Sequence, residues 1–505
     1  MRPLHAIAAV AMICIVTVIR IATTHAVFSP TYDEPLHIPG GYEFVAEHHY
    51  RISTDNPPLA RAVFAWPLRH AHPMTKEGLE SVGQIYDSAG DYMTGVVRSR
   101  RGNLIFVVLA IAGVALLAGS VMDASAAVMA AFVFAMLPTT LALGGLATTD
   151  MAGTAAFAFA LLALISWVRR PAWRETVWLG VAFAFVFLTK FSVAPSILAA
   201  AAVICILWRT FPLKYAIAGG VIALFLIYGV YASVHAAPRF LLGIQQVVQH
   251  SREGQDAFLL GEVRHTGWWY YFPIALGVKT PIALLLLAGS GMAMMKKRED
   301  FAMAAIAGAI LAIGMTSKAD LGVRHILPIY VPLSLLAARG TRSIRAMPLC
   351  AWLIVGSFLA HPDYLPWMNA FAGSHPEQVL LDSNFDWGQD VVRLRDACRA
   401  KGIQEIGVAI FGTVDMKRIG MPPVHDIDPI HASPGWYAVS ESFIIPAQVR
   451  DPRAYTWLTR QPFERIGKTI RLYRVEPGAR FVILRREDAE GPPAENKGVL
   501  RSRSG

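Results

Sequence analysis

The sequence predicts a polytopic α-helical membrane protein with a small soluble α/β domain at its C-terminal end. Of its 505 residues, 54% are apolar and only 16% are charged. The mean hydropathy is +0.43, and polar residues fall mostly between long apolar runs. This composition excludes an ordinary soluble protein. The net charge of +10 does not indicate nucleic-acid binding, because Lys and Arg cluster between the apolar runs and in the C-terminal tail.

Eleven apolar runs are interpreted as membrane spans. Some are near or below the length of about 20 residues that a helix needs to cross a bilayer. The first run is long and is followed by only a weak cleavage site, so we expect an uncleaved anchor rather than a signal peptide. The runs cover residues 4–22, 103–121, 124–146, 151–168, 175–190, 193–208, 214–234, 273–295, 301–316, 325–338 and 347–361.

Basic clusters predict the orientation of these spans. In this topology one side of the membrane receives the clusters at 169–174, 208–214, 296–300 and 339–345. The positive-inside rule makes that side, and the N-terminus, cytoplasmic. The other side receives the first loop, the turn at Asp150, the loops 235–272 and 318–325, and the chain beyond 361. The unusual polar residues therefore share the noncytoplasmic face.

The composition divides the chain into three parts. Residues 1–361 form the membrane domain, whose first loop, 23–102, is expected to carry helices along the membrane surface. Residues 362–484 are predicted to form the α/β domain, and 485–505 a disordered tail. Strands are predicted at 379–381, 405–411, 435–442 and 468–475, and helices at 389–401, closed by Gly402, and around 451–459.

An acidic pair follows the first span, in TYDEPLHIPGGYEF (31–44). Asp33 and Glu34 are adjacent acids that repel each other, so one keeps its proton to a higher pH than a lone carboxylate would. Such a pair can act as a general base, share a proton or hold a metal ion. The alternative is an acidic first turn of an interfacial helix, with Pro35 at an early helical position. The two interpretations are compatible.

Other ionisable residues lie within or beside the spans, where each costs about 2.5–3.5 kcal/mol at the bilayer centre and therefore points to function. Asp150 ends GGLATTD at an outer membrane edge, where it could alternatively cap the next helix. Lys190 lies at the outer end of its span, where a lysine can also simply extend to the interface.

Three further basic residues suit a phosphate at membrane depth. Lys279 lies about two turns into its span, roughly 9 Å at 1.5 Å per residue, where only an anion would offset its charge. Arg324 and His325 begin a span at the outer surface. Arg holds phosphate through its planar fork, and His donates from a ring nitrogen. Ordinary interfacial anchoring is the alternative for this pair.

Acids and bases on one face indicate a groove at the outer leaflet for a lipid phosphate. If that phosphate carries a sugar, basic residues stabilise the leaving phosphate while a carboxylate deprotonates an acceptor hydroxyl. The reaction would be glycosyl transfer without a nucleotide donor.

The stretch DSNFDWGQD (382–390) follows a predicted strand, at the end where open α/β sheets bind ligands. Its acids are spaced like those of a calcium loop, but Gly388 is one place late and Arg393 occupies the twelfth position, so the EF-hand pattern fails. A turn and helix cap is the preferred interpretation. A sugar-acceptor or accessory site is the alternative.

At several of these stretches the chain resembles the GT-C superfamily of polyprenyl-phosphate-sugar glycosyltransferases. It is most similar to bacterial relatives of the protein O-mannosyltransferases and to the aminoarabinose transferase of lipid A. The resembling stretches are YDEPLHIPGGYEF (32–44), DNPPLARAVFAWPL (55–68), TTDMA (148–152), FLTKFS (187–192) and GVRHILPIY (322–330). One departure is that O-mannosyltransferases carry HPPL where this chain has Asn56 to Leu59.

The resemblance implies roles for the predicted site residues. Asp33 would match the first-loop acid that serves as base or metal ligand, with Glu34 beside it. Asp150 would match the acid of the second outer loop. A divalent ion, Mg²⁺ or Mn²⁺, would be held by Asp33, Glu34 and Asp150. The implied contacts to the lipid phosphate are Lys190, Lys279, Arg324 and His325.

We therefore expect a multi-pass glycosyltransferase of hexosyltransferase type in the bacterial inner membrane, with its catalytic face and C-terminal domain in the periplasm. Its partners would be a polyprenyl-phosphate sugar donor, membrane lipid, and a glycan, lipid or protein hydroxyl as acceptor. Two alternatives stay open. One is a transporter or lipid flippase, although no internal repeat and no paired broken helices are evident. The other is a noncatalytic relative that only binds glycan or protein.

Overall fold

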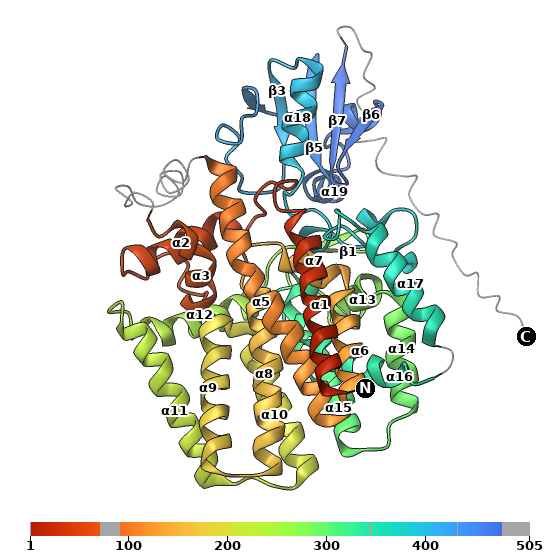
Figure 1. The fold of residues 1–505 in the computed structure, drawn as a ribbon. Helices are drawn as coiled ribbons and strands as arrows, with labels where there is room; N and C mark the ends of the chain where they lie inside the picture. The colour runs from red at the N-terminus through yellow and green to blue at the C-terminus, as the bar shows by residue number, and fades with distance from the viewer. Residues whose placement is uncertain (1, 71–90, 344–345, 432, 477–505) are drawn as a thin grey trace, which may run out of the picture.

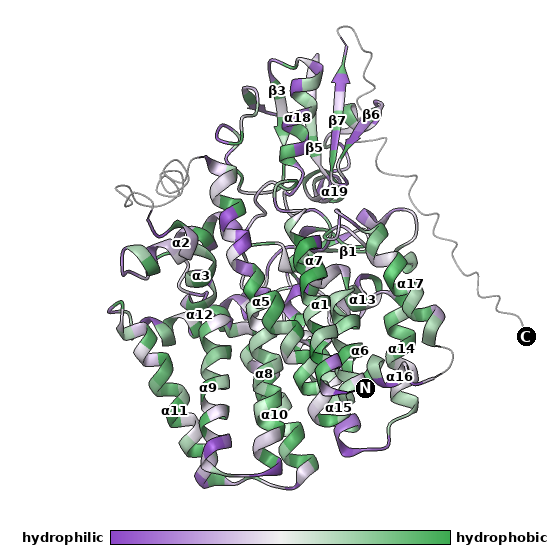
Figure 2. Ribbon diagram, in the orientation of Figure 1, coloured by the Kyte–Doolittle hydropathy of each residue, from purple (hydrophilic) through white to green (hydrophobic). Residues whose placement is uncertain are grey.

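The apolar runs fold as helices packed side by side, and a sheet domain covers one end of them (Figure 1). This computed structural model describes residues 2–70, 91–343, 346–431 and 433–476. The predicted disordered tail, 485–505, lies outside the described residues. Large apolar side chains are exposed on the outer faces of several helices, as a lipid-facing surface requires. The bundle is accordingly apolar along its length in Figure 2.

All eleven predicted runs are helical, but eleven full spans are not confirmed. Within the part of the chain that the structure describes, five helices are long and apolar enough to cross a membrane, or up to seven if each bent pair counts as one span. Others are short, with 17 residues in α9 and 11 in α16. The helices of these runs are α1 (Pro3–Ala22), α5 (Tyr92–Val121), α6 (Ala124–Ala135), α7 (Pro138–Gly144), α8 (Asp150–Arg169), α9 (Trp173–Thr189), η2 (Phe191–Val193), α10 (Ala194–Trp208), α11 (Leu213–Ala232), α13 (Tyr271–Lys279), α14 (Ile282–Ala293), α15 (Arg298–Gly314), η3 (Val323–Ile329), α16 (Tyr330–Gly340) and α17 (Ala346–Leu359).

Proline bends the two broken spans. The α6 and α7 helices meet at 70° just before Pro138, and α13 and α14 meet at 108° around Pro281. A residue that precedes proline is driven out of the helical conformation, so each apolar run breaks there. The second break leaves Lys279 as the last residue of α13.

The basic clusters gather at one end of the bundle. Arg169 forms a 2.7 Å ion pair with Glu299, and the Arg298 guanidinium lies over the Trp208 ring. Polar colour marks this end in Figure 2, below the apolar helices. The opposite end carries the acids of the first loop and the sheet domain (Figure 1). The predicted separation of the two polar ends is therefore seen in the structure, whereas the compartment that each one faces stays a prediction.

The described part of the first loop contains helices, as predicted. They are α2 (Glu34–Ala46), α3 (Pro58–Ala65) and the short η1 (Trp66–Leu68). A further helix, α12 (Arg239–Glu253), follows α11 and runs across the top of the bundle beside them (Figure 1). The Thr54 hydroxyl donates to Gln246 of α12 at 2.9 Å, so the two loops pack together.

The C-terminal domain is a five-stranded mixed sheet with strand order β4-β3-β5-β7-β6. Strand β3 pairs in parallel with β4 and with the central strand β5, and β7 pairs antiparallel with β5 and β6. Its elements are α18 (Val391–Lys401), β3 (Ile406–Ala409), β4 (Val424–Asp426), β5 (Gly435–Ser440), α19 (Glu441–Arg450), α20 (Thr456–Thr459), β6 (Phe463–Ile466) and β7 (Ile470–Val475). Helix α18 ends at Gly402 in the left-handed conformation, as predicted.

One predicted strand of this domain is wrong, and one predicted helix is shorter than expected. Residues 379–381 make only an isolated bridge, Leu380 with Leu259, because the backbone then turns sharply at Asp382, whose φ is 55°. Leu259 ends β1 (Ala257–Leu259), which forms a two-stranded sheet with β2 (Glu262–Arg264). The helix expected around 451–459 is present only as the four-residue α20, and the longer α19 was not predicted. Pro446 and the apolar run before it concealed α19 in the sequence.

Candidate functional site

A cavity of about 300 Å³ lies between the bundle and the sheet domain. Four of the seven predicted site residues line it: Asp33, Lys190, Arg324 and His325. Asp150 lies behind one of them, whereas Glu34 and Lys279 make their contacts elsewhere. The remaining lining comes from the first loop, α12 and the C-terminal domain and includes Tyr32, His37, Asp55, His250, Asp382, Trp387 and Phe411.

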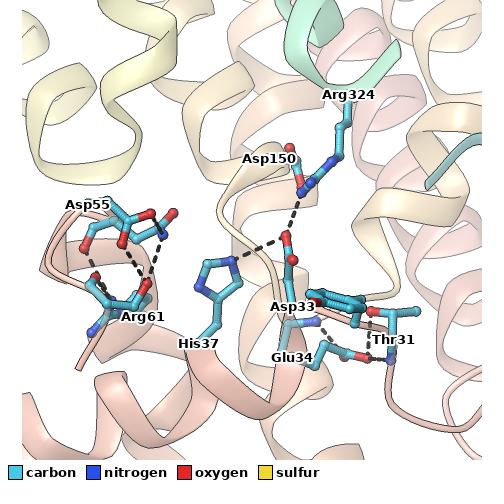
Figure 3. A network of polar contacts seen from close by, with 12 residues as sticks. Thr31, Asp33, Glu34, His37, Asp55, Arg61, Asp150 and Arg324 are labelled. Carbon is cyan, nitrogen blue, oxygen red and sulfur yellow. Dashed lines mark hydrogen bonds and ion pairs between the residues drawn. The ribbon is translucent and has the colours of Figure 1, made fainter. Parts of the chain in front are cut away.

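Asp33 contacts Arg324 at the wall of the cavity (Figure 3). Asp33 is the residue before α2, and its carboxylate makes no capping bond to that helix. It is therefore free to accept a hydrogen bond from Arg324, at 2.5 Å between Oδ2 and Nη1. His37, one turn along α2, places Nε2 3.9 Å from the same oxygen. Burial lowers the pKa of His37 to about 4, so the ring is neutral and Arg324 is the partner that matches the charge of Asp33.

The 382–390 segment holds Arg324 in place. The guanidinium lies 4.5 Å from the centre of the Trp387 ring, a geometry that favours a cation. Gly322, two residues before Arg324, has a φ of 123° and lies so close to Ser383 and Asn384 that a side chain would clash. Only glycine fits there. The approach of the two segments thus fixes the backbone from which Arg324 reaches Asp33.

Lys190 pairs with Asp150 at the side of the cavity. Asp150 is the first residue of α8 and is 2% exposed; its carboxylate bonds directly to the Lys190 ammonium. Lys190 follows α9 and is itself buried, so it does not extend to water as the alternative interpretation held. The Asp150 carboxylate also lies near Arg324 (Figure 3). One acid therefore bonds to Lys190 and lies near a second cation, Arg324, at the same wall.

Within the described chain, the basic wall has buried nitrogen atoms without hydrogen-bond partners. Arg324 Nε and His325 Nε2 are buried, and neither has a hydrogen-bond partner among the described residues. Buried polar groups without partners are rare and costly. Together with the Lys190 ammonium, they form a set that an anion in the cavity would satisfy.

Glu34 turns away from Asp33, toward Thr31 (Figure 3). Its carboxylate receives two bonds from Arg100, at 2.6 and 2.8 Å, and one each from the backbone N–H groups of Thr31 and Ala147. Burial acts to raise the pKa of Glu34, but Arg100 and the other donors outweigh it and lower that pKa. Glu34 therefore ties the first loop to α5 and to the turn before α8, outside the cavity.

The predicted divalent metal does not fit these three acids. Asp33, Glu34 and Asp150 face Arg324, Arg100 and Lys190 respectively. Within the described ranges, no group of three or more His, Cys, Asp or Glu residues is placed to hold a metal ion. Each carboxylate is already neutralised by a cation of the protein.

Lys279 anchors the C-terminal part of the chain. Its ammonium donates to the backbone carbonyls of Leu365, Trp367 and Asn384, at 2.6, 2.7 and 2.8 Å. Its three N–H donors are thereby occupied, and the side chain is buried away from the cavity. The amine that was expected to contact phosphate holds instead the segment that supports Arg324.

We predict that Lys279→Met destabilises the attachment of the C-terminal domain. Three buried carbonyls lose their donor, at about 1–3 kcal/mol each. Limited proteolysis should cut the variant between α17 and β3 faster than the wild type, and the unfolding temperature should fall. Lys214→Met, at the other end of the bundle, should leave both unchanged. Wild-type stability of Lys279→Met together with weakened lipid-phosphate binding would instead support the original expectation.

The first loop and the 382–390 segment are joined by backbone hydrogen bonds. Ser29 N–H donates to Gln389 at 3.0 Å, and Tyr32 N–H donates to Trp387 at 3.1 Å. Gly388, with a φ of 86°, permits the close approach of Phe411. The segment does form a turn before α18, as preferred from the sequence, but it also delivers Asp382 and Trp387 to the cavity.

Sequence reasoning missed several residues of this site. The i,i+4 spacing of Asp33 and His37 could have marked His37 as a neighbour of the acid. The partner of Glu34 could not be chosen among the basic residues near 98–101, because only the fold brings Arg100 to the first loop. Asp382 was named within its motif, but its place in the cavity depends on the turn that replaced the predicted strand.

An apolar groove of about 530 Å³ adjoins the cavity. It lies between α10, α12 and α15 and is lined largely by aliphatic and aromatic side chains. The groove and the cavity share five lining residues: Phe191, Ser192, Val247, His250 and His325. A polar, basic cavity therefore continues into an apolar groove along helices of the bundle.

Comparison with known proteins identifies the fold. Residues 96–232 match the family described as dolichyl-phosphate-mannose-protein mannosyltransferase. The structure is similar to that of ArnT from Cupriavidus metallidurans in the apo state, with a TM-score of 0.55, 13% identity and coverage of 93% of this chain and 98% of that one. The ArnT structure bound to undecaprenyl phosphate gives a TM-score of 0.54, 14% identity and coverage of 92% and 97%. No curated protein sequence matches the chain.

The predicted resemblance to GT-C glycosyltransferases is thus confirmed by the match over residues 96–232 and by a fold similar to that of ArnT. The apolar helices and the similarity of the fold together support a multi-pass membrane protein.

Proposed function

We propose that the chain is a glycosyltransferase that moves a sugar from a polyprenyl-phosphate donor to a hydroxyl group on the periplasmic side of the bacterial inner membrane. The observation that carries this proposal is the pairing of a carboxylate with three basic residues in one cavity that continues into an apolar groove. A polyprenyl phosphate has the matching form, a charged head and a long apolar tail.

Donor binding uses both parts of the site. The tail would lie in the groove between α10, α12 and α15, and the phosphate would meet Lys190, Arg324 and His325. The unsatisfied Arg324 Nε is a donor for such an anion, and His325 Nε2 donates to it in the tautomer that carries the proton on that nitrogen. ArnT has been crystallised with undecaprenyl phosphate, a lipid of this class, which supports the proposal.

The reaction then needs a base and a stabilised leaving group. The acceptor hydroxyl gives its proton to Asp33 as its oxygen bonds to the anomeric carbon. The bond from that carbon to the phosphate oxygen breaks, and its electron pair leaves with the polyprenyl phosphate. Donors preorganised in a cavity stabilise that developing charge. A single displacement inverts the configuration of the transferred sugar.

The same geometry assigns supporting roles to the other residues of the site. Arg324 bonds to Asp33, so it orients the base and faces the phosphate from one position. Asp150 holds Lys190 and adds negative charge behind Arg324. Glu34 and Lys279, expected from the sequence to take part directly, act in this proposal by positioning the first loop and the 382–390 segment.

Lys190→Gln tests donor binding. The Gln amide can still donate a hydrogen bond to the buried Asp150 carboxylate, but the charge that faces the phosphate is lost. A charge-assisted hydrogen bond contributes about 1.5–3 kcal/mol, so undecaprenyl phosphate should bind roughly 10-fold to 100-fold more weakly. Lys214→Gln is the matched control. Equal affinity of the purified Lys190→Gln and wild-type proteins would contradict the assignment of this wall to the donor phosphate.

A further inference from the structure

The cavity has a side that the lipid groove does not reach. Tyr32, Asp382, Trp387 and Phe411 line the cavity but not the apolar groove. They belong to the first loop and to the C-terminal part of the chain. If the donor enters from the groove, this side is where the acceptor must meet the sugar.

Two aromatic rings stand at this side. Tyr32 and Phe411 are stacked, with centroids 5.3 Å apart and an angle of 22° between the rings. Tyr32 is 40% exposed and Phe411 is half-buried, so part of the pair is open to a ligand. The Thr413 hydroxyl donates to the Tyr32 carbonyl at 2.7 Å and joins the two segments. Rigid aromatic faces suit the C–H face of a sugar ring.

A carboxylate accompanies the rings. Asp382 has a φ of 55°, and its backbone N–H donates to Ser442 Oγ at 3.1 Å. Its neighbour Ser383 donates to the carbonyl of Leu321, and Asn384 accepts from Val323 N–H at 3.0 Å. A non-glycine residue in the left-handed region persists when its surroundings fix it. Asp382 is thus held rigidly beside the loop that carries Arg324.

The charge state of Asp382 suits hydroxyl binding. Burial raises its pKa to about 6, although Arg324 opposes the shift. At neutral pH the group is a carboxylate and accepts hydrogen bonds. Arg324 and Asp33 are the charged groups that act on it across the cavity.

We propose that Asp382, Tyr32 and Phe411 form the acceptor subsite, and that its ligand is a neutral saccharide whose ring packs on the aromatic pair while a hydroxyl donates to Asp382. This inference rests on the proposed function, because it assumes that the sugar donor occupies the opposite side of the cavity, next to the apolar groove. A second hydroxyl of the same saccharide then faces Asp33 for transfer. The C-terminal domain is by this account part of the substrate site.

The test separates saccharide binding from donor binding. Full-length protein in detergent is mixed with maltotriose, mannotriose and N-acetylchitotriose, and binding is read by saturation-transfer NMR. Undecaprenyl phosphate affinity is measured in parallel. The variants are Asp382→Asn, which keeps the left-handed backbone accessible, and Phe411→Ala. The controls are Asp396→Asn and Phe443→Ala, which alter exposed side chains of the same domain.

We expect at least one saccharide to bind wild type and both controls. Its affinity should fall 10-fold or more in Asp382→Asn and Phe411→Ala, with undecaprenyl phosphate affinity unchanged. The inference is overturned if no saccharide binds wild type, if Asp382→Asn binds saccharide as wild type does, or if a Ser/Thr peptide is bound in an Asp382-dependent manner instead. If the wild-type protein transfers no sugar from a lipid donor but binds saccharide in an Asp382-dependent manner, the proposed function is contradicted and this subsite is upheld.

Discussion

Asp33→Asn should lower the turnover number for glycosyl transfer by roughly 10²-fold to 10⁴-fold, the contribution expected of a general base. The substitution preserves the size of the side chain and an oxygen that can accept from Arg324, but it removes the proton acceptor. Asp33 lies before α2 without capping it, so the helix should not unfold. The affinity for undecaprenyl phosphate should stay within a few fold of wild type.

The measurement is single-turnover transfer at saturating donor, beside Asp396→Asn as the control. Asp396 is exposed on α18 and pairs only with its neighbour Arg395 among the contacts of the described chain. A folded Asp33→Asn protein with the wild-type turnover number would remove Asp33 from the role of base. A loss confined to donor affinity would make it a binding residue.

Substitution of the adjacent acid, Glu34, should reduce the stability of the protein, in contrast to the loss of turnover expected for Asp33→Asn. Glu34→Ala leaves the Arg100 guanidinium buried without its charge partner, and both side chains are fully buried. Breaking a buried pair by removal of one partner costs about 3–5 kcal/mol. An unfolding entropy of about 1 kcal/mol/K is expected for a chain of this length, so the unfolding temperature should drop by roughly 3–5 °C, and the yield of folded protein should fall.

The matched control for this prediction is Glu262→Ala. Glu262 also pairs with an arginine, Arg264, but its side chain is 60% exposed, and exposed pairs contribute little. Thermal unfolding in detergent measures both variants. If Glu34→Ala unfolds like wild type yet has lost its turnover, then Glu34 acts in the chemistry, as its place beside Asp33 first suggested.

The sequence was informative about which polar residues share a face. Apolar runs placed Asp33, Asp150, Lys190 and Arg324 at one end of the spans, and the structure brings these four together. Membrane insertion makes this possible, because helix length and loop charge constrain which end each residue reaches. The number of full spans was less predictable, since Pro138 and Pro281 bend two of the apolar runs.

The direction in which each side chain points at this shared end could not be predicted from the sequence. Glu34 and Lys279 lie as near the outer end as Asp33 does, but each is engaged by partners distant in the chain, Arg100 at one and the carbonyls of 365–384 at the other. A helical rotation of about 100° per residue points two adjacent acids to different surroundings. The place of Asp382 in the cavity could not be predicted for a related reason. Its position depends on contacts between the C-terminal domain and the loop at 321–323.

The most direct measurement of the central claim is the release of free polyprenyl phosphate by purified wild-type protein. A panel of undecaprenyl-phosphate sugars serves as donors, with nucleotide sugars beside them and an envelope extract as acceptor. The account predicts release from at least one lipid donor, in equal amount to the sugar transferred, with inversion and with no use of nucleotide sugars. Folded protein that releases nothing from any lipid donor, or that moves the intact lipid across a vesicle membrane instead, would contradict it.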